Sequence, residues 1–506
     1  MAKVKATDLI DYTRASSGTA LAKVSYGSEL VTNGTFDSDT TGWTALGATQ
    51  AIVSGELEIT TTSAGGGSWQ LISVTPNKPY LLTLDRRVGT ADIASVIVYD
   101  GGIPGSGAPS LINDTDAGTF SEAFVPTNDT VSVYLRAAAL SAGTTAYYDN
   151  ISVKEVLFDQ PGGTLQLFNH PTNIPRIEYD ADGNLLGLLI EESRTNLVTY
   201  SEDFTQPVWA KSAAGTGSIP VVTSNYAVAP DGTNSASRIQ MNAGSGTTSG
   251  DYSLMRFTVS SAPTTLINSL WIKSNTESSQ TVKLSYGASD AVHTATTEWQ
   301  RFDIVSGNPN FADVVIRGDQ TVSSVDLLIW GYQAEAGDFP TSYIPTSGAT
   351  ATRAADVASI PVSEFGYNQN QGTVVVEART NNSGSTDDYV FQLDDDTNNN
   401  RYVIRLNNTS GTTTFVVDNG SATATDSGSV IGEGDTFKVA FAFSDSDQAV
   451  SLDGASVQTF ASAIPSNLLT LNLGSTGTSA FLDGHIKSIR YFPLRLTNAT
   501  LQELTR

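Results

Sequence analysis

Apolar and polar residues alternate in short runs along the whole chain, and Gly, Asn, Asp or Ser separates one run from the next. In Thr130–Arg136 (TVSVYLR) the alternation places Val131, Val133 and Leu135 on one face. Gln371–Glu377 (QGTVVVE) is rich in the β-branched residues that strands favour. A period of two residues predicts strands with one buried face, because successive side chains of a strand point to opposite sides.

Turn residues and one capping residue mark further elements. Tyr389–Leu406 (YVFQLDDDTNNNRYVIRL) predicts a hairpin, since an Asp/Asn turn separates two apolar runs. One short helix is expected at the C-terminus, where Thr497 can cap a segment that ends near Leu504. Many short strands with frequent turns favour sandwiches over βαβ units. The pattern therefore predicts an all-β fold of three serial β-sandwiches, with short connectors and one short C-terminal helix.

A weak internal repeat suggests where the domains begin and end. Leu30–Trp43 (LVTNGTFDSDTTGW) and Leu197–Trp209 (LVTYSEDFTQPVW) share an opening Leu-Val-Thr, a Phe midway and a final Trp. Each precedes an aromatic strand, Tyr147–Val153 in one copy and Leu328–Glu335 in the other. A repeat this wide indicates two copies of a domain rather than a solenoid. We expect an N-terminal segment at 1–27, a first module at 28–156, a connector at 157–194, a second module at 195–340, a connector at 341–364 and a third domain at 365–506.

Composition narrows the classes of function. The chain carries 27 basic and 52 acidic residues, a formal net charge of −25, and a surface this acidic repels the phosphate backbone of nucleic acids. Because there is no cysteine, disulfides, Cys-ligated zinc and thiol nucleophiles are excluded. No apolar run approaches the about 18 residues that membrane insertion requires. The first residues lack the apolar core of a signal peptide, so synthesis and folding are expected in a cytoplasm.

Several stretches of the sequence are distinctive enough to be compared with known protein families. Four of them are DYTRASSGT (Asp11–Thr19), PRIEYDADGNLLGLLIEESRTNLVTYSEDF (Pro175–Phe204), APDGTNSASRI (Ala229–Ile239) and GYQAEAGDFPTSYIPTSGATATRAAD (Gly331–Asp356). They resemble modular virion proteins of tailed bacteriophages, namely tail fibre, tail tip and head fibre proteins. In those proteins the first stretch usually runs soon into the second. The long separation here indicates that the first module is an insertion.

Two further resemblances concern individual domains. The residues NGTFDSDTTGW and YYDNISVKEV are similar to family 4/9-type carbohydrate-binding modules, which implies a jelly-roll fold for the first module and its repeat. The C-terminal stretch FLDGHIKSIRYFPLRLTNATLQELT (Phe481–Thr505) looks like the closing strand of a concanavalin A-like lectin domain. These similarities specify architecture better than they specify a ligand.

The resemblance to phage proteins implies a virion surface fibre or spike that adheres to glycans of the host cell. Its implied partners are host cell-surface polysaccharide, other virion proteins of the tail or capsid, and further copies of itself in a homotrimer. The implied location is the virion surface, after synthesis in the host bacterial cytoplasm. Two alternatives remain open: a purely structural decoration or connector protein, and a polysaccharide-degrading tailspike.

The same resemblance implies a structural calcium ion in the first module. In such modules a calcium ion often ties the first strand to the last, and the matching positions here are Asn33, through its carbonyl, Asp37 and Asp149. Carboxylate and carbonyl oxygens suit this hard cation. The family usually has Glu where this chain has Asp37, and in the second module the closing position falls on Trp330 or Gly331. The alternative is that both carboxylates are solvated turn residues.

Two other acidic clusters have the first ligand spacings of a calcium loop. They are Asp180-x-Asp182-x-Asn184 and Asp394-x-Asp396-x-Asn398. Neither continues with the Gly and Glu that complete such a loop, and both lie between strand-like runs. We expect them to be ordinary turns.

Exposed aromatic rings are the candidate sugar platforms, since a ring offers an apolar face to the C–H side of a pyranose. Trp69, which follows an Ala-Gly-Gly-Gly-Ser run, is the best candidate, and Tyr99 lies before the IPGSG loop. The alternative for both is a place in a core, where aromatic residues are commonest. Four other tryptophans are expected to be packing residues: Trp43 and Trp209 at matched positions, and Trp271 and Trp330 within apolar strands.

The sequence contains no catalytic constellation, and an enzyme is not expected. His170, His293 and His485 each stand alone, and no G-x-S-x-G elbow is present. The nearest approach to a basic patch is Arg401, Arg405 and Arg490, which more simply are solvated strand residues. Since the chain is strongly acidic, binding of a neutral glycan, or of an anionic glycan through calcium, is the expectation.

Overall fold

Nearly all regular structure in the protein is β-strand, as the alternation predicted. The computed structural model describes residues 9–115, 117–138, 142–284, 292–306, 308–319, 323–381, 387–407, 412–420, 423–432 and 434–506. Strands account for 53% of the chain. The one α-helix of this described part is α1 (Asn498–Leu504), and the side chain of its N-cap Thr497 accepts a hydrogen bond from the Thr500 N–H at 3.3 Å. The predicted fold class and the predicted helix are confirmed.

The chain divides into two compact units. One unit comprises residues 23–165 with 169–172 and contains a single β-sandwich, which we call the first sandwich. The other comprises residues 1–22, 166–168 and 173–506, which we call the larger unit, and it contains the second and third sandwiches. The chain therefore leaves the larger unit after Ala22, builds the first sandwich and then returns.

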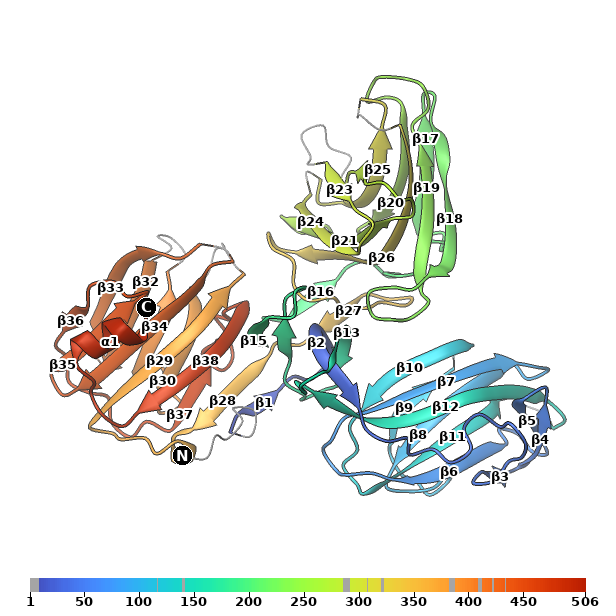
Figure 1. Ribbon diagram of the computed structural model, residues 1–506, viewed down its shortest axis with the longest axis horizontal. Coiled ribbons are helices and arrows are strands. Elements are labelled where there is room, and N and C mark those ends of the chain that lie inside the picture. The colour runs from blue at the N-terminus through green and yellow to red at the C-terminus, as the bar shows by residue number, and fades with distance from the viewer. Residues whose placement is uncertain are drawn as a thin grey trace. The chain divides into compact units, whose positions relative to one another are not determined.

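The first sandwich encloses its own apolar core between two antiparallel sheets (Figure 1). The five-stranded sheet has the order β3 (Thr44–Leu46), β6 (Gly67–Ser73), β11 (Thr130–Ala138), β8 (Ile93–Asp100), β9 (Ser110–Asp114). The facing sheet has the order β10 (Gly118–Phe124), β7 (Tyr80–Val88), β12 (Thr145–Phe158), β2 (Gly18–Tyr26), β13 (Thr164–His170), with β5 (Glu56–Thr61) and β4 (Ala48–Val53) beside β12. Val131, Val133 and Leu135 all lie in this core, as their spacing predicted.

The second sandwich is built in the same way from a smaller set of strands. One sheet has the order β17 (Trp209–Ala214), β20 (Tyr252–Thr258), β25 (Phe311–Arg317). The other has the order β18 (Ser218–Ala227), β19 (Ala236–Asn242), β26 (Ser324–Ala336), β21 (Leu266–Ser274), β24 (Gln300–Val305). A short pair, β22 (Gln280–Val282) with β23 (His293–Ala295), accompanies them. Their facing sides share one core.

The third sandwich has two seven-stranded sheets. One has the order β1 (Asp11–Thr13), β28 (Val357–Pro361), β37 (Thr470–Leu473), β30 (Asp388–Asp394), β31 (Asn400–Leu406), β32 (Thr412–Asn419), β33 (Thr423–Val430). The other has the order β14 (Ile177–Tyr179), β15 (Leu185–Ile190), β38 (Gly484–Phe492), β29 (Gln371–Thr380), β34 (Thr436–Ser444), β35 (Asp447–Leu452), β36 (Gln458–Phe460). Four of these strands, β1, β14, β15 and β28, come from outside residues 365–506.

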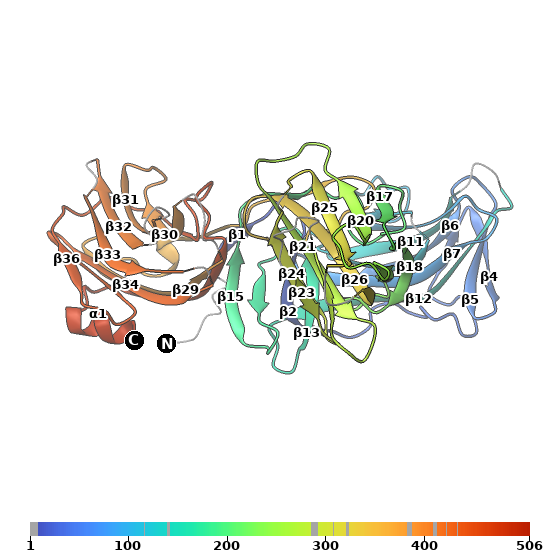
Figure 2. The ribbon, with the colours of Figure 1, turned by 90° about the horizontal axis from the view of Figure 1, so that it is seen from above.

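Local elements of the third sandwich also follow the sequence. β30 and β31 form the predicted hairpin, with Asp394 opposite Arg401 next to the turn. Helix α1 lies over β34 and β35, where its Leu501 covers Val375, Ala440, Ala442 and Ala449 (Figures 1 and 2). Among the described residues no helix is long and apolar enough to cross a membrane.

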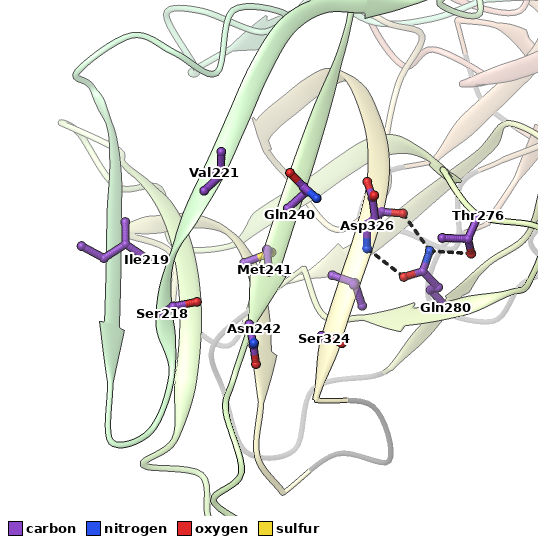
Figure 3. Close-up of a pocket in the computed structure, with 11 residues that line it drawn as sticks. Ser218, Ile219, Val221, Gln240, Met241, Asn242, Thr276, Gln280, Ser324 and Asp326 are labelled. Atoms are coloured by element: carbon purple, nitrogen blue, oxygen red, sulfur yellow. Dashed lines mark hydrogen bonds between the residues drawn. The ribbon is translucent and has the colours of Figure 1, made fainter.

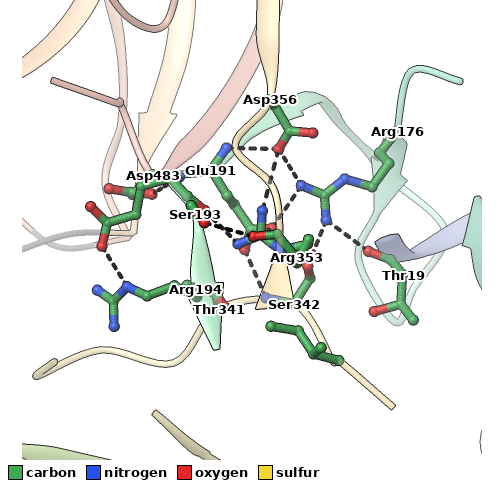
Figure 4. Close-up of polar contacts among 12 residues, drawn as sticks. Thr19, Arg176, Glu191, Ser193, Arg194, Thr341, Ser342, Arg353, Asp356 and Asp483 are labelled. Atoms are coloured by element: carbon green, nitrogen blue, oxygen red, sulfur yellow. Dashed lines mark hydrogen bonds and ion pairs between the residues drawn. The ribbon is translucent and has the colours of Figure 1, made fainter. Parts of the chain in front are cut away.

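A buried ionic cluster in the larger unit joins segments that are far apart in the sequence (Figure 4). Asp356, just before β28, binds Arg176, just before β14, through Oδ2, and it also accepts the Tyr12 hydroxyl and Arg14 Nη1 through Oδ1. Glu191, just after β15, lies 2.7 Å from Arg176 Nη2. No charged side chain named here is more than 7% exposed.

The remaining members of the cluster form ion pairs and hydrogen bonds with the buried charges, which would otherwise be destabilised by burial. Arg353, at the end of the short strand β27 (Ala351–Arg353), lies 3.4 Å from Glu191 Oε2 and 3.8 Å from Asp356 Oδ2. The backbone N–H and the hydroxyl of Ser342 each donate to Glu191 at 2.7 Å. Burial alone would raise the pKa of Glu191, but the guanidinium groups of Arg353 and Arg176 hold it well below its usual range.

Removing one charge from this cluster should destabilise the larger unit strongly. In Asp356→Asn the three guanidinium groups of Arg14, Arg176 and Arg353 keep one carboxylate, and uncompensated buried charge typically costs about 3–5 kcal/mol. Urea unfolding followed by circular dichroism should show the loss in the transition of the larger unit.

The control is an ion pair at the surface. Glu503 and Arg506 are 3.0 Å apart with side chains 73% and 63% exposed, so Glu503→Gln should cost less than about 1 kcal/mol. Equal unfolding midpoints for Asp356→Asn and Glu503→Gln would contradict a stabilising role for the cluster.

Candidate functional site

The outer face of the five-stranded sheet of the first sandwich gathers aromatic residues. Strand β11 crosses the middle of this sheet, and its alternation turns Ser132, Tyr134 and Arg136 away from the core. The register places Trp69 of β6 opposite Tyr134, and Tyr99 of β8 opposite Ser132. The two residues that the sequence singled out therefore lie on one face, with Tyr134 between them. We call this surface the aromatic face.

Tyr134 was not among the binding residues predicted from the sequence. The alternation in TVSVYLR nevertheless places it on the face opposite to that of Val133 and Leu135. Its ring centroid lies 6.5 Å from that of Tyr99, at an interplanar angle of 34°. The side chain is buried, its hydroxyl donates to the Gly65 carbonyl at 2.8 Å, and burial raises its pKa. Tyr134 thus forms a fixed floor between Trp69 and Tyr99, both of which are half-buried.

The glycine run before Trp69 permits this packing. A Cβ at Gly66 would lie 1.9 Å from the Gly47 carbonyl oxygen, and one at Gly67 would lie 2.6 Å from the ring of Tyr134. Gly65 has a positive φ of 70°, which favours glycine. At the other end of the face, the Ser132 hydroxyl donates to the Gly102 carbonyl at 2.7 Å, so the loop after Tyr99 is fixed to the sheet.

Hydrogen bonding distinguishes Trp69 from most of the other tryptophans. The indole N–H of Trp69 has no acceptor among the described residues, and since the side chain is half-buried it can reach solvent or a ligand. The indole N–H of Trp43 instead donates to the Asn33 carbonyl at 3.1 Å, and that of Trp209 to the Tyr200 carbonyl at 2.8 Å. A half-buried ring with a free donor can offer both stacking and a hydrogen bond.

The matched tryptophans of the repeat have the packing role that their positions predicted. Trp43 and Trp209 are both buried. Trp43 lies against Phe36 with 5.6 Å between ring centroids, and Trp209 lies against Phe204 with 5.2 Å. The shared sequence pattern therefore marks a shared core contact.

Trp330 and Trp271 form a separate aromatic cluster in the second sandwich. Trp330 is buried, donates its N–H to the Ser235 hydroxyl at 2.9 Å, and has its ring centroid 4.7 Å from that of Tyr343. Trp271 is half-buried beside it, and Arg301 lies over its ring at 4.5 Å. Because protein groups cover these rings, they offer no open platform.

The residues matched to a calcium site lie at one end of the first sandwich. Asn33 has a positive φ of 55°, its side-chain amide donates to the Asp39 carbonyl at 2.8 Å, and its own carbonyl accepts the Trp43 indole N–H. The next carbonyl, that of Gly34, accepts from the Ile151 N–H at 2.9 Å and so joins this loop to the closing strand β12.

Asp149 is the carboxylate of this region that lacks, in the described part of the chain, a hydrogen-bond partner on one oxygen. It lies opposite Asp85 in the register of β12 and β7, and its Oδ1 has no hydrogen-bond partner among the described residues. Burial raises its pKa, and the negative charges of Asp85, Glu56 and Asp37 raise it further. No group of three or more His, Asp or Glu side chains within the described ranges is arranged to hold a metal.

The other acidic clusters are turns, as expected. Asp180 Oδ1 accepts from the backbone N–H groups of Asp182 and Asn184 at 3.0 and 2.8 Å. In the second cluster, Asp394 Oδ1 accepts from the Asp396 N–H at 2.9 Å and Oδ2 accepts from the Asn472 side chain at 2.9 Å. Local hydrogen bonds therefore account for both.

The three arginines considered as a basic patch do not come together. Arg401 and Arg405 lie on β31 of one sheet of the third sandwich, whereas Arg490 lies on β38 of the other. Arg405 pairs with Asp387 at 2.5 Å, and Arg401 donates to the Gln392 side chain at 2.7 Å. Their ordinary role as strand residues is confirmed.

The histidines are likewise scattered. His485 lies in β38, as its alternation predicted, with Nε2 2.6 Å from Glu178 Oε2. His170 is buried against Phe158, with 4.4 Å between ring centroids. The residues beside them are thus a carboxylate for His485 and an aromatic ring for His170.

A groove lies on the second sandwich (Figure 3). It is lined by residues of β18, β19 and β26, including Ile219, Gln240 and Asp326. Its polar wall is already satisfied, because Gln280 donates to the Asp326 carbonyl and accepts the Asp326 N–H, at 2.7 and 2.8 Å. The Asp326 carboxylate is bound by Arg238. Among the described residues the groove thus lacks the free aromatic ring and the unpaired guanidinium that the aromatic face offers.

Comparisons with known proteins return fold similarity and no family. No protein-family model matches the chain, and no curated protein matches it. Among solved structures, the chain is similar to a family 40 carbohydrate-binding module of a Ruminococcus gnavus sialidase, described as bound to α2,6 sialyllactose. That match has 17% identity and a TM-score of 0.24, and it covers 28% of this chain and 85% of the other.

Two further solved structures give the same picture. A family 4 carbohydrate-binding module matches with 20% identity and a TM-score of 0.21, over 25% of this chain and 99% of that module. A pentraxin from Limulus polyphemus matches with 16% identity and a TM-score of 0.23, over 26% of this chain and 68% of the pentraxin.

Proposed function

We propose that this protein is a surface fibre or spike of a tailed-bacteriophage virion that adheres to host-cell surface polysaccharide through the aromatic face. The location on the virion and the attachment to tail or capsid proteins rest on the resemblance of the signature stretches to phage virion proteins. The glycan-binding role rests on the half-buried Trp69 beside Tyr134 and Tyr99. The role proposed is binding, without catalysis.

The arrangement of Trp69 is the observation that carries the proposal. Trp69 belongs to strand β6, and its indole N–H has no hydrogen-bond acceptor among the described residues. An aromatic ring held in this way presents a large apolar surface at little cost in side-chain entropy. The C–H face of a pyranose can stack on such a ring while sugar hydroxyls hydrogen-bond at its edge.

Truncating this ring should weaken binding to host cells. For Trp69→Ala we expect adsorption of the purified protein to fall about tenfold or more, because the main apolar contact is lost. Trp69→Phe, which keeps an apolar ring and removes the N–H, should lie between Trp69→Ala and the wild type. The measurement is retention on cells with intact polysaccharide and on cells stripped of it.

Tyr226→Ala supplies the control. Tyr226 is 46% exposed on β18 of the second sandwich and is not a residue of the aromatic face, so this change should leave adsorption unaltered. If the wild type binds stripped and intact cells equally well, a structural connector is the better account. Release of reducing ends from the polysaccharide would instead indicate a depolymerase.

We also propose a structural calcium ion held by Asp37 and Asp149. The unpartnered Oδ1 of Asp149 and its acidic neighbours fit a cation, and the Asn33 carbonyl has one lone pair left beside the Trp43 N–H. Excess EDTA should lower the melting temperature of the first sandwich, since a cation bound to the folded state stabilises it by mass action. Asp149→Asn should abolish the effect of EDTA.

Asp92→Asn is the matched control for calcium, because Asp92 is an exposed aspartate of the same sandwich. This variant should melt as the wild type does, with and without EDTA. A wild-type first transition that is indifferent to EDTA would exclude the proposed ion.

Finally, we propose that the protein assembles as a homotrimer, as the fibre resemblance implies. Multi-angle light scattering of the purified chain should then give about 160 kDa, three times the chain mass of 53.2 kDa. A mass of one chain at micromolar concentration would contradict the trimer.

A further inference from the structure

Arg136 is the charged residue of the aromatic face. It follows Tyr134 on the outward side of β11 and lies opposite Gly67 of β6, so it is the diagonal neighbour of Trp69. Such diagonal neighbours lie about 7–8 Å apart, within reach of long side chains. Gly67 has no side chain to separate the two. One ligand could therefore contact both Trp69 and Arg136.

The guanidinium of Arg136 has no carboxylate partner among the described residues. The other two arginines of the first sandwich lie on β7 of the facing sheet and are paired, Arg86 with Asp114 at the end of β9 and Arg87 with Glu56 of β5 at 2.5 Å. The unpaired guanidinium on the aromatic face is thus available to an anion.

No carboxylate side chain occupies an outward strand position of the aromatic face in the part of the chain that the structure describes. Its outward positions on the five described strands are occupied by Thr, Leu, Gly, Trp, Ser, Tyr, Ile, Asn and Arg, and the nearby Asp100 and Asp114 point to the core side. Asp100 is held there by the Thr127 and Asn128 backbone N–H groups, at 3.0 and 3.1 Å. At the outward positions of the described strands an anion would meet one guanidinium and no carboxylate, although the chain has a net charge of −25.

The position of the guanidinium is restricted before any ligand arrives. A Cβ at Gly65 would lie 2.6 Å from Arg136 Nη2, so the side chain lies over the Gly65 turn. The carbonyl of Gly65 in turn accepts the Tyr134 hydroxyl. Arg136 is therefore half-buried beside the floor of the aromatic face, with its planar fork free to bind a carboxylate through two hydrogen bonds.

We infer that the glycan bound at the aromatic face is acidic, with a sugar carboxylate held by Arg136 while the neighbouring ring stacks on Trp69. The inference rests on the proposed function, and it replaces the neutral or calcium-bridged glycan expected from the overall charge. The two expectations differ because the overall charge averages over the whole surface, whereas this inference considers the one face.

The test uses the full-length protein and four carboxylated polysaccharides: polygalacturonate, alginate, hyaluronan and polysialate. Each is compared with its carboxyl-reduced form, in which the carboxylates have become primary alcohols. At least one acidic form should bind at least about tenfold more tightly than its reduced form, because the charge-assisted hydrogen bonds are lost on reduction. This preference should shrink as salt is raised, through screening.

Variants at Arg136 make the test specific. Arg136→Gln should remove the preference for the acidic form and leave binding of the reduced form unchanged, and Arg136→Lys should restore only part of it. Arg87→Gln is the matched control, since it removes an arginine of the same sandwich that already pairs with Glu56. Thermal melting of each variant checks its fold, because no described hydrogen bond depends on the Arg136 guanidinium.

The outcomes separate this inference from the proposed function. If the reduced forms bind as tightly as the acidic forms, and through Trp69 but not Arg136, the glycan is not selected by charge and the inference is wrong, while the proposed function stands. If none of the eight polymers binds but the protein adsorbs to intact cells through Trp69 and independently of Arg136, the inference is again wrong. Loss of binding in Arg87→Gln equal to that in Arg136→Gln would also overturn it.

Discussion

Three guanidinium groups buried at one place require carboxylates beside them, and this requirement organises the larger unit. Arg14, Arg176 and Arg353 share Asp356 and Glu191 at almost zero exposure. A buried ion is tolerated only when its partners and hydrogen bonds are all in place. The segments that supply these residues must therefore meet in one arrangement, which fixes β1, β14, β15 and β28 against the third sandwich.

The same cluster explains what the recognisable stretches of the sequence are for. Arg14 belongs to DYTRASSGT, Arg176 and Glu191 to PRIEYDADGNLLGLLIEE, and Arg353 and Asp356 to GATATRAAD. These charged residues of the recognisable stretches thus form a buried scaffold. The resemblance consequently says more about architecture than about the ligand.

The sequence predicted those parts of the fold that local patterns determine. Alternation found the strands around Val131 and Val374, turn residues found the hairpin of β30 and β31, and Thr497 marked the start of the helix. The recruitment of β1 and β28 could not be predicted, because each is short and its pairing depends on residues hundreds of positions away. Short strands carry too little pattern to specify a distant partner.

The residues of the candidate site were also predictable only in part. Trp69 and Tyr99 could be chosen from composition and loop context, but Tyr134 and Arg136 become candidates only when the register shows which strands flank β11. Net charge is a property of the whole chain, whereas binding depends on the charges that face the ligand.

A binding surface with so few contact groups suits a protein that is repeated on one particle better than a protein that binds through a single site. One half-buried ring and one guanidinium bury little surface, so a single site should bind a glycan modestly. When several sites are joined in one particle, later contacts become intramolecular and the overall avidity can rise by about 10²–10⁴. Repetition on a virion would therefore supply the affinity that the individual aromatic face lacks, and it would leave each contact weak enough to release and rebind along a polysaccharide.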